Sequence, residues 1–423
     1  MPVSAQEWPE WRGPTAQGHA RTAGLPVRWG ESSNVVWKTP VPGRGWSSPV
    51  LEGGEIWLTT AIERAARPED AERRAKASSN RQPLTVLDHL ELRAIALDRN
   101  TGRLKHDVLL LTENEPQLIH ELNSYASPSP VLEDGRLYCH FGTFGTACVD
   151  TRTTRVLWTN TSLRIQHENG PGSSPVVWQD RLVVHLDGSD SQSIAALDTR
   201  TGQTVWRTAR SGALRENPQT RKSYATPLLL EVAGRVQLFS AGADWLFGYD
   251  PQDGRELWKL GFGAPGYSLS SRPVAGGGRF FTSTGFDEPA LLAVGYAAGR
   301  DPEILWRYSR GVPTMSSLLL VGKELYFVSD SGGILTCLDA ASGREHYRER
   351  LGGNHSASPI LADGRIYLPS REGITSVITP GVSFELIAQN QLDGRIMASP
   401  AAVDGALFVR TDTAMYRIGQ ASP

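Results

Sequence analysis

Cysteine, long apolar runs and net charge are all scarce in this chain of 423 residues. The three cysteines, Cys139, Cys148 and Cys337, form no Cys-x-x-Cys or Cys-x-x-Cys-His motif, which leaves zinc and covalent haem without sequence support. No apolar run approaches the roughly 18 residues of a membrane-spanning helix. The formal net charge of -2 gives no electrostatic reason to expect nucleic acid or an anionic membrane surface as a partner.

Catalytic signatures are missing as well. The chain contains no Gly-x-Ser-x-Gly, no phosphate-cradling loop and no His-Glu-x-x-His motif. What is abundant is glycine (43), proline (27) and tryptophan (12), between short β-rich runs. This combination predicts an all-β protein of many short strands. The segment Val3–Gln6 resembles the end of a signal-peptidase site, so we expect a secreted or periplasmic protein whose leader has been removed.

A turn with fixed offsets recurs along the chain. An aspartate stands eight residues before an aromatic or histidine, and glycine occupies the fourth position after the aspartate in four copies, whereas Thr154 departs from the pattern. Repetition at fixed offsets indicates a repeat architecture. The pairs are Asp98/His106, Asp150/Trp158, Asp198/Trp206, Asp250/Trp258 and Asp339/Tyr347, the glycines are Gly102, Gly202, Gly254 and Gly343, and Trp37 and Trp306 are further structural repeat residues.

A second landmark counts the repeats. Ser/Thr-Pro dipeptides open a strand–turn–strand pattern, and the equivalent positions are Pro49, Pro130, Pro175, Pro227, Pro273, Leu318, Pro359 and Pro400. Most intervals are about 41–46 residues, the length of a four-stranded propeller blade. The last repeat lacks a fourth strand, and Val35–Pro40 matches it. We therefore predict an eight-bladed β-propeller of four-stranded antiparallel blades, in which the N-terminal strand completes the last blade and removes exposed sheet edges.

Within this fold the repeated residues have structural roles. Aspartate accepts hydrogen bonds from its own downstream amides, glycine takes a positive φ, and tryptophan fills the gap between adjacent blades. We expect a strap over residues 1–34 whose tryptophans pack on the flank of the ring, one propeller over 35–419 and a tail over 420–423. An insertion at 62–90 in blade 1 contains a short helix within Glu63–Lys76; a surface decoration and a lid or docking loop are its two interpretations.

The most complete copy of the repeat, Ala196-Leu-Asp-Thr-Arg-Thr-Gly202 followed by Trp206, resembles the pyrroloquinoline-quinone-like (PQQ-like) repeat family. That family includes quinoprotein dehydrogenases, the propeller lipoprotein of the outer-membrane assembly machinery, and secreted bacterial propellers that share the Trp-Arg-Gly-Pro opening. The resemblance extends from about Val35 to Ile418 and implies the fold, not a function. Quinoprotein dehydrogenases carry a disulfide of adjacent cysteines over the quinone, and this chain has no adjacent cysteines.

Candidate ligand-binding residues lie in the loops that would meet at the channel mouth, where the blades differ. Histidine and acidic side chains that converge there could bind a divalent metal, run acid–base chemistry, or merely satisfy loop backbone and water. In His185-x-Asp187 both side chains would lie on one face of a strand. The candidates are His120, Asn123, Tyr125, His140, His167, Glu168, His185, Asp187, Asp190, Asp244, Arg272, Asp287 and His355.

These observations favour a binding or scaffold module for a protein or glycan partner, acting as a monomer. The alternative is an enzyme that uses the histidine–acid cluster, either a divergent quinoprotein oxidoreductase or a carbohydrate-active enzyme. We predict no cofactor; quinone with calcium belongs to the alternative, and the missing cysteine pair argues against it.

Overall fold

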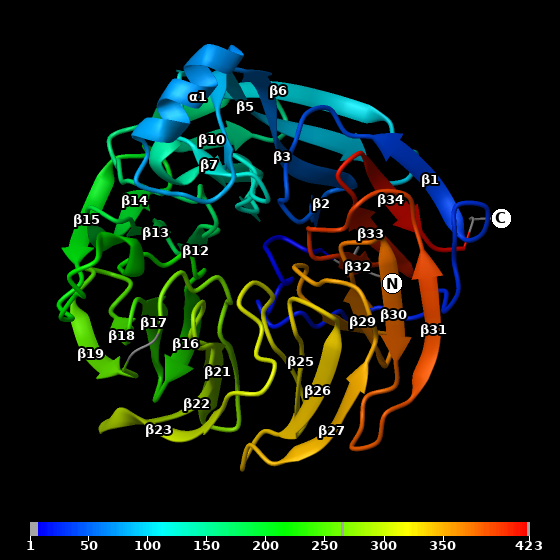
Figure 1. Ribbon diagram of the computed structural model, residues 1–423. Helices are drawn as coiled ribbons and strands as arrows, with labels where there is room; N and C mark the ends of the chain where they lie inside the picture. The colour runs from blue at the N-terminus through cyan, green and yellow to red at the C-terminus, as the bar shows by residue number, and fades with distance from the viewer. Residues whose placement is uncertain (1–6, 264–265, 421–423) are drawn as a thin grey trace.

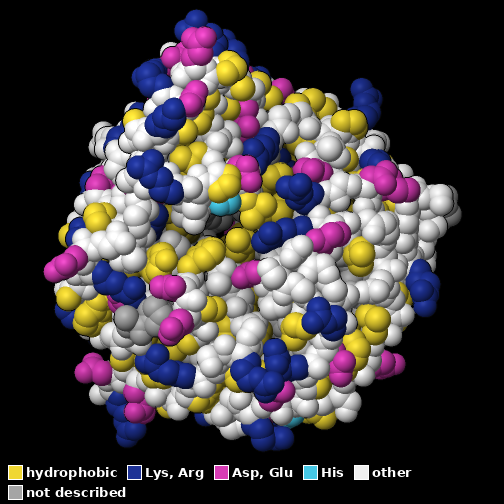
Figure 2. All heavy atoms as spheres, in the orientation of Figure 1, with side chains coloured by type: hydrophobic (Ala, Val, Ile, Leu, Met, Phe, Trp, Pro, Cys, Tyr) yellow, Lys and Arg dark blue, Asp and Glu magenta, His cyan; other side chains and the backbone are white. Residues whose placement is uncertain are grey.

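Eight four-stranded antiparallel sheets surround one axis in the computed structural model, which describes residues 7–263 and 266–420. Figure 1 views the ring along this axis, and the chain runs once around it. Figure 2 shows the same face, which is hollowed near the middle. The predicted eight-bladed propeller is therefore confirmed. The proposed cleavage site Val3–Gln6 lies outside the described residues.

Each blade is named here from its innermost to its outermost strand, and the short innermost strand follows the Ser/Thr-Pro landmark. Blade 1 contains β2 (Val50–Glu52), β3 (Glu55–Ala65), β5 (Leu87–Asp98) and β6 (Leu104–Asn114); blade 2, β8 (Val131–Glu133), β9 (Arg136–His140), β10 (Thr146–Asp150) and β11 (Val156–Asn160); blade 3, β12 (Val176–Trp178), β13 (Arg181–Asp187), β14 (Gln192–Asp198) and β15 (Thr204–Ala209); blade 4, β16 (Leu228–Val232), β17 (Arg235–Gly242), β18 (Trp245–Tyr249) and β19 (Glu256–Gly261). Blade 5 contains β20 (Val274–Gly276), β21 (Arg279–Ser283), β22 (Leu291–Ala297) and β23 (Arg300–Tyr308); blade 6, β24 (Leu319–Val321), β25 (Glu324–Val328), β26 (Ile334–Asp339) and β27 (Glu345–Arg350); blade 7, β28 (Ile360–Ala362), β29 (Arg365–Pro369), β30 (Ile374–Ile378) and β31 (Leu386–Gln391); blade 8, β32 (Ala401–Val403), β33 (Ala406–Arg410), β34 (Ala414–Ile418) and β1 (Val35–Pro40).

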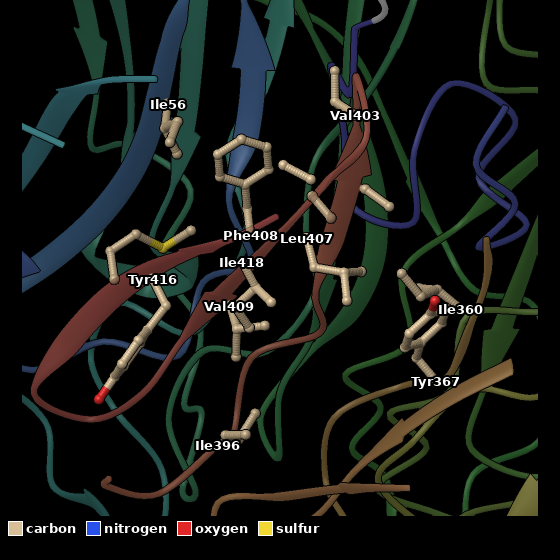
Figure 3. Close-up of a cluster of buried hydrophobic side chains, with 14 of the residues drawn as sticks. Ile56, Ile360, Tyr367, Ile396, Val403, Leu407, Phe408, Val409, Tyr416 and Ile418 are labelled. Atoms are coloured by element: carbon tan, nitrogen blue, oxygen red, sulfur yellow. The ribbon is translucent and has the colours of Figure 1, made fainter. Parts of the chain in front are cut away.

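The N-terminal strand closes the ring, as predicted. β1 pairs antiparallel with β34, with Val35 opposite Ile418 and Pro40 opposite Ala414. A single cluster of buried apolar side chains then joins blades 7, 8 and 1 across this seam (Figure 3). Phe408 and Tyr416 of blade 8 belong to that cluster and are almost fully buried. Both the hydrogen bonds of β1 and this apolar contact hold the two chain ends together.

The repeated turn connects one blade to the blade before it. Asp198 Oδ1 accepts hydrogen bonds from the backbone N–H groups of Arg200 and Thr201, at 3.0 and 2.8 Å. Gly202 has φ +72°, and a Cβ there would lie 2.4 Å from the ring of Trp158, which comes from the preceding blade. The indole Nε1 of that tryptophan donates to the carbonyl of Thr199. At this junction the predicted structural roles of aspartate, glycine and tryptophan are the observed ones.

The same arrangement is found at three more junctions, where Trp37 packs on Gly102, Trp206 on Gly254 and Trp306 on Gly343. Blade 2, whose turn has Thr154 in place of glycine, is consistent with this packing of tryptophan on glycine. Thr154 has φ 58° there, but blade 1 supplies His106 in place of a tryptophan, and this ring stacks on Trp57 at 5.9 Å. Because no indole comes from blade 1, the space that glycine provides elsewhere is not needed at Thr154.

Trp258 fills the gap to the next blade through a different contact. Its half-buried indole lies over Gly248 of its own blade, where a Cβ would be 2.1 Å from Nε1, and Nε1 donates to Gln237 Oε1 at 3.0 Å. Blade 5 has no Asp-x-x-x-Gly turn to receive the indole, and Gly299 in its β22–β23 turn has nothing within 4 Å. Trp258 instead packs against a buried apolar cluster of blades 4 and 5 and stacks on Phe280 of blade 5, with ring centroids 6.4 Å apart.

A ring of hydroxyl acceptors connects the innermost parts of the blades. At seven junctions the backbone N–H of the residue before the landmark donates to the hydroxyl of its equivalent in the next blade, at 2.8–3.0 Å. The donor–acceptor pairs are Ser48–Ser129, Ser129–Ser174, Ser174–Thr226, Arg272–Ser317, Ser317–Ser358, Ser358–Ser399 and Ser399–Ser48. The last pair links blade 8 to blade 1. The Ser/Thr of each landmark therefore supplies one link, and seven of the eight junctions around the ring are joined in this way.

Arg272 replaces the eighth hydroxyl and connects the ring to the N-terminal strap. Its guanidinium donates to the carbonyls of Pro227 and Trp11, at 3.1 and 2.8 Å, and pairs with Glu10 at 2.8 Å. Only 1 % of Arg272 is exposed. The buried cation is thus balanced by the strap, so it does not face a ligand.

The strap crosses the end of the channel, and the prediction that it packs on the flank of the ring is wrong. Trp8 exchanges backbone hydrogen bonds with Leu51 of blade 1, both at 2.9 Å, and further along the strap Ala20 N–H donates to Leu361 O of blade 7. In Figure 1 this blue segment passes the centre of the ring. Trp8 lies against the innermost strands because its ring needs an apolar pocket, which these strands provide.

The insertion in blade 1 extends a hairpin and ends over the channel mouth. β3 and β5 remain paired as far as Ala65 and Leu87, so the short helix expected within Glu63–Lys76 is α1 (Pro68–Ala77), in the second part of that segment and one residue beyond it. No residue of α1 is buried, and no helix among the described residues is long and apolar enough to cross a membrane. A two-stranded sheet of β4 (Leu84–Thr85) and β7 (Ile119–His120) fixes the end of the insertion.

We predict that Gly202→Ala destabilises the protein more than Gly234→Ala does. Both glycines have positive φ, +72° and +75°, which costs alanine about 1 kcal/mol. Only the Cβ at position 202 meets an indole ring, while nothing lies within 4 Å of the one at 234. The clash should cost about 1–3 kcal/mol more. Urea unfolding measures both variants; equal losses would contradict the packing role of Gly202.

We predict that Ser358→Ala lowers the free energy of unfolding by about 1–3 kcal/mol, because the buried N–H of Ser317 loses its acceptor. Ser316→Ala is the matched control, since its buried hydroxyl has no hydrogen-bond partner. Its removal should be neutral or stabilising. Chemical denaturation compares the two, and a loss at Ser316 as large as at Ser358 would show that the ring bond is unimportant.

Candidate functional site

A cavity of 590 Å³ occupies the centre of the ring on the face seen in Figure 2, where apolar side chains gather around the hollow. Trp11 of the strap forms part of its wall, and its indole Nε1 donates to Ser399 Oγ at 3.2 Å. Ser79 and Gln82 of the blade 1 insertion line it as well. Its volume lies within the range of pockets that hold small organic ligands.

One repeat position supplies the wall of this cavity. The residue three before each landmark lines it in all eight blades, namely Trp46, Ser127, Gly172, Tyr224, Ser270, Met315, Ser356 and Met397. The position is structurally equivalent in every blade, but its side chain varies from none to an indole. The wall is therefore uneven, with large side chains contributed by blades 1, 4, 6 and 8.

The side chains that line the cavity carry mainly aromatic, amide and hydroxyl groups. Tyr267 and Phe286 add further aromatic faces, and among the lining residues Lys222, Arg81 and His120 are the basic ones, with no aspartate or glutamate. Many of the polar groups are already used within the protein. Asn123 Nδ2, for example, donates to the carbonyls of Asn169 and Pro171, at 2.8 and 3.1 Å. Several aromatic and thioether faces thus remain for contact with a ligand.

The insertion is bonded to the loops on the other side of the mouth. Asn80 Nδ2 donates to Asn169 Oδ1 at 2.9 Å and to the carbonyl of Glu168 at 3.1 Å. Gln219, in the loop before blade 4, donates to Ser79 Oγ at 3.3 Å. Since these residues line the cavity or lie beside it, the insertion is part of the site rather than a separate surface decoration.

Three of the predicted histidines converge, but on a second and much smaller pocket. His140, His167 and His185 line a space of only 10 Å³ together with Asp187. As the alternation of the strand predicts, His185 and Asp187 lie on one face of β13, with Nε2 and Oδ2 2.8 Å apart. Arg210 completes the group by donating to both oxygens of Asp187, at 2.8 and 2.7 Å. Such a space holds about one water molecule and no organic ligand.

The histidines of this pocket are held neutral. Burial lowers the pKa of His140 to about 3, and burial likewise lowers the pKa of His167 to about 3. His140 Nε2 and His167 Nδ1 are buried without a hydrogen-bond partner in the protein. Among the described residues no group of three or more histidines, cysteines and acids has the geometry of a metal site.

The remaining candidates are dispersed. His120 and Asn123 line the cavity, whereas Tyr125 is buried and donates to the carbonyl of Gln117. Glu168 accepts from Ser189 Oγ at 3.1 Å, and Asp190 accepts from the backbone N–H of Gln166 at 2.8 Å. These loops hold each other in place around the mouth.

Three further candidates lie apart from the cavity wall. Asp244 pairs with Arg215, and Asp287 is exposed with φ 84°. His355 is buried, and its two ring nitrogens lie 2.9 and 3.1 Å from the carbonyls of Pro369 and Gly352. Sequence reasoning missed Trp11, Trp46, Met315 and Met397. The distance of three residues from each landmark would have identified the last three.

Quinone with calcium does not fit the residues of the cavity. Calcium takes oxygen ligands that generally include carboxylates, and the lining contains none. Cys139, Cys148 and Cys337 are free thiols buried within strands and do not line the cavity. The adjacent-cysteine disulfide that the resemblance implies therefore has no counterpart in the wall.

Eight blades, several of them joined by tryptophan–turn contacts, define a PQQ-like repeat propeller. The sequence matches the family described as "Outer membrane protein assembly factor BamB" over residues 22–208, 91–334 and 294–413, and the chain belongs to this family. A search of curated proteins gives no match.

Solved structures confirm the fold. BamB from Moraxella catarrhalis superposes with a TM-score of 0.55 at 13 % identity, covering 85 % of this chain and 99 % of that one. Quinohemoprotein alcohol dehydrogenase from Comamonas testosteroni gives 0.64 at 10 % identity, covering 99 % and 81 %. A europium-containing methanol dehydrogenase gives 0.54 at 11 %, covering 97 % and 90 %. At these identities the likeness concerns the fold alone.

We predict that acid destabilises the protein through the buried histidines of the smaller pocket. An unfolded histidine takes up a proton below about pH 6.5, but buried His140 stays neutral down to about pH 3, so its contribution to stability is lost as the pH falls. Between pH 7 and 5 this amounts to about 2 kcal/mol per histidine. His140→Gln should reduce the loss measured by urea unfolding at the two pH values.

His89→Gln is the control for this measurement, since His89 lies on the hairpin extension and contacts Asn114 outside the pocket. It should leave the pH dependence unchanged. An unaltered acid loss in His140→Gln would show that burial of this imidazole does not set the pH dependence.

Proposed function

We propose that the protein is a binding module of the periplasm or extracellular space whose central cavity holds a glycan. The observation that carries this proposal is the 590 Å³ cavity, with aromatic faces on several sides and hydroxyl and amide groups between them. Aromatic rings stack on the apolar C–H faces of sugars, while amides and hydroxyls match sugar hydroxyls. Trp11, Trp46 and Tyr267 are the rings best suited to this contact.

The enzyme alternative depended on the histidine–acid cluster. That cluster faces a space of 10 Å³, which supports no organic substrate beside His140, His167 and Asp187. Arg210 is bound to both oxygens of Asp187, so the carboxylate is already engaged. The pocket is better explained as a polar contact within blades 2 and 3 than as a catalytic site.

A protein partner is the second candidate, and the family supports it. The family description and the Moraxella catarrhalis structure both name BamB, and the family description calls it an outer membrane protein assembly factor. That wording also supports our proposal of a location in the periplasm or outside the cell. Such a partner would contact the outer surface of the ring and leave the central cavity to its own ligand.

Filling the cavity tests the proposal. Ser270 is a half-buried wall residue, and Ser270→Phe would occupy ligand space without removing a major contact. We predict that titration calorimetry with trigalacturonate, lactose 3′-sulfate and chitotriose detects binding of at least one sugar by the wild type, and that Ser270→Phe weakens it roughly tenfold or more.

Ser383→Phe is the matched control, because Ser383 is exposed in the turn between β30 and β31, outside the cavity. It should bind as the wild type does. Absence of binding by every sugar, or equal binding by Ser270→Phe, would refute the glycan proposal. Retention of a quinone chromophore in the presence of calcium would refute it in favour of the oxidoreductase.

A further inference from the structure

The charged residues that line the central cavity are all basic. Lys222 and Arg81 are the charged residues of its lining, and His120 is the third basic group. No carboxylate of the lining balances them. Arg81 is exposed at the rim, whereas only 3 % of Lys222 is exposed, so the two cations differ in how far they are removed from water.

Lys222 is a buried cation without an ion pair among the described residues. Its Nζ donates one hydrogen bond, to Gln219 Oε1 at 2.7 Å. The acid that influences it most is Glu168, whose carboxylate accepts hydrogen bonds from Ser189 Oγ at 3.1 Å and Ser79 Oγ at 3.5 Å. An ammonium group has three N–H donors, so two remain for a ligand. Burying a charge without a partner is costly, and an anion in the cavity would offset that cost.

The surroundings hold Lys222 in place at the mouth. Its carbonyl accepts a hydrogen bond from Ser268 N–H at 2.7 Å, and Ser268 itself lines the cavity. Gln219, its hydrogen-bond partner, also donates to Ser79 of the insertion. Lys222 therefore lies where the loops before blades 4 and 5 meet the insertion. A ligand that reached Lys222 would be in contact with all three.

His120 supplies a second donor of defined tautomer. Its Nδ1 accepts a hydrogen bond from Leu122 N–H at 3.0 Å, so in the neutral ring the proton is on Nε2. Burial lowers the pKa of His120, which favours this neutral form. A neutral N–H donor and a cation suit an acceptor group with negative charge.

We infer that the glycan of the central cavity is anionic, a saccharide that carries a carboxylate or a sulfate, and that Lys222 is the residue that selects it. This inference rests on the proposed function and specifies its ligand class. The aromatic wall residues would contact the sugar rings, while Lys222 Nζ donates to the anionic group.

The test compares ligands that differ only in charge. Trigalacturonate is titrated beside its methyl ester, and lactose 3′-sulfate beside lactose, by calorimetry with the full chain. We expect the wild type to bind one of the acids roughly tenfold or more tightly than its neutral counterpart, because a hydrogen bond to a charged group is lost in the latter. Rising ionic strength should weaken binding of the acid alone. The pair that shows the preference distinguishes a carboxylate from a sulfate.

Lys222→Met removes the charge and keeps the length of the side chain. It should weaken binding of the acid roughly tenfold while leaving the neutral counterpart unchanged. Lys222→Arg should retain the preference for the acid, because it keeps a charged donor. Lys323→Met, in the exposed turn between β24 and β25, is the matched loss of one positive charge and should have no effect. Thermal melting establishes that each variant is folded.

The outcomes separate the two proposals. If neutral sugars bind as tightly as the acids, the anionic ligand class is refuted. If Lys222→Met leaves the preference for the acid intact, the assignment of Lys222 as the selecting residue is refuted. In both cases the glycan cavity stands. If neither acid nor neutral sugar binds the wild type, both proposals are refuted.

Discussion

The ring of hydroxyl acceptors is the constraint on which this propeller depends. At seven junctions a backbone N–H that would otherwise be buried without a partner donates to a serine or threonine hydroxyl of the next blade. The bond from Ser399 to Ser48 links the last blade to the first, so it forms only when the ring is closed. Proline follows six of the seven hydroxyl residues and fits the same logic, since it has no N–H that needs an acceptor.

The ring also determines where the central cavity is located. The ring places the residue three positions before each landmark at an equivalent site around the axis. These eight residues form part of the wall of the cavity. Outside the ring, four junctions are joined by tryptophan on glycine turns, as with Trp158 on Gly202. What the blades share therefore produces the scaffold. What they do not share, such as Tyr224, Met315 and the insertion, gives the cavity its shape and chemistry.

Much of the fold was predictable because its signals are local. The Asp-to-Trp turn, the blade count and the closing strand β1 all follow from fixed offsets. At Trp258 the offset is kept but the contact differs, because blade 5 lacks the turn and the indole stacks on Phe280 instead. The site was less predictable still. Three predicted histidines of blades 2 and 3 do converge, but packing that no offset reveals leaves a space of only 10 Å³ beside them. The strap was misplaced for the same reason, since the pocket for Trp8 is assembled from distant strands.

The sequence by itself determined the number of blades, the turn chemistry and the way the ring closes, because these depend on hydrogen bonds and contacts between residues at regular spacing. Only the tertiary structure decided which polar groups remain available to contact a ligand. Arg272 and Lys222 are both buried cations in loops that precede blades. Arg272 is paired with Glu10 of the strap, whereas Lys222 lines the cavity with a single hydrogen bond. The difference arises from segments far apart in the chain, and it determines which of the two can meet a ligand.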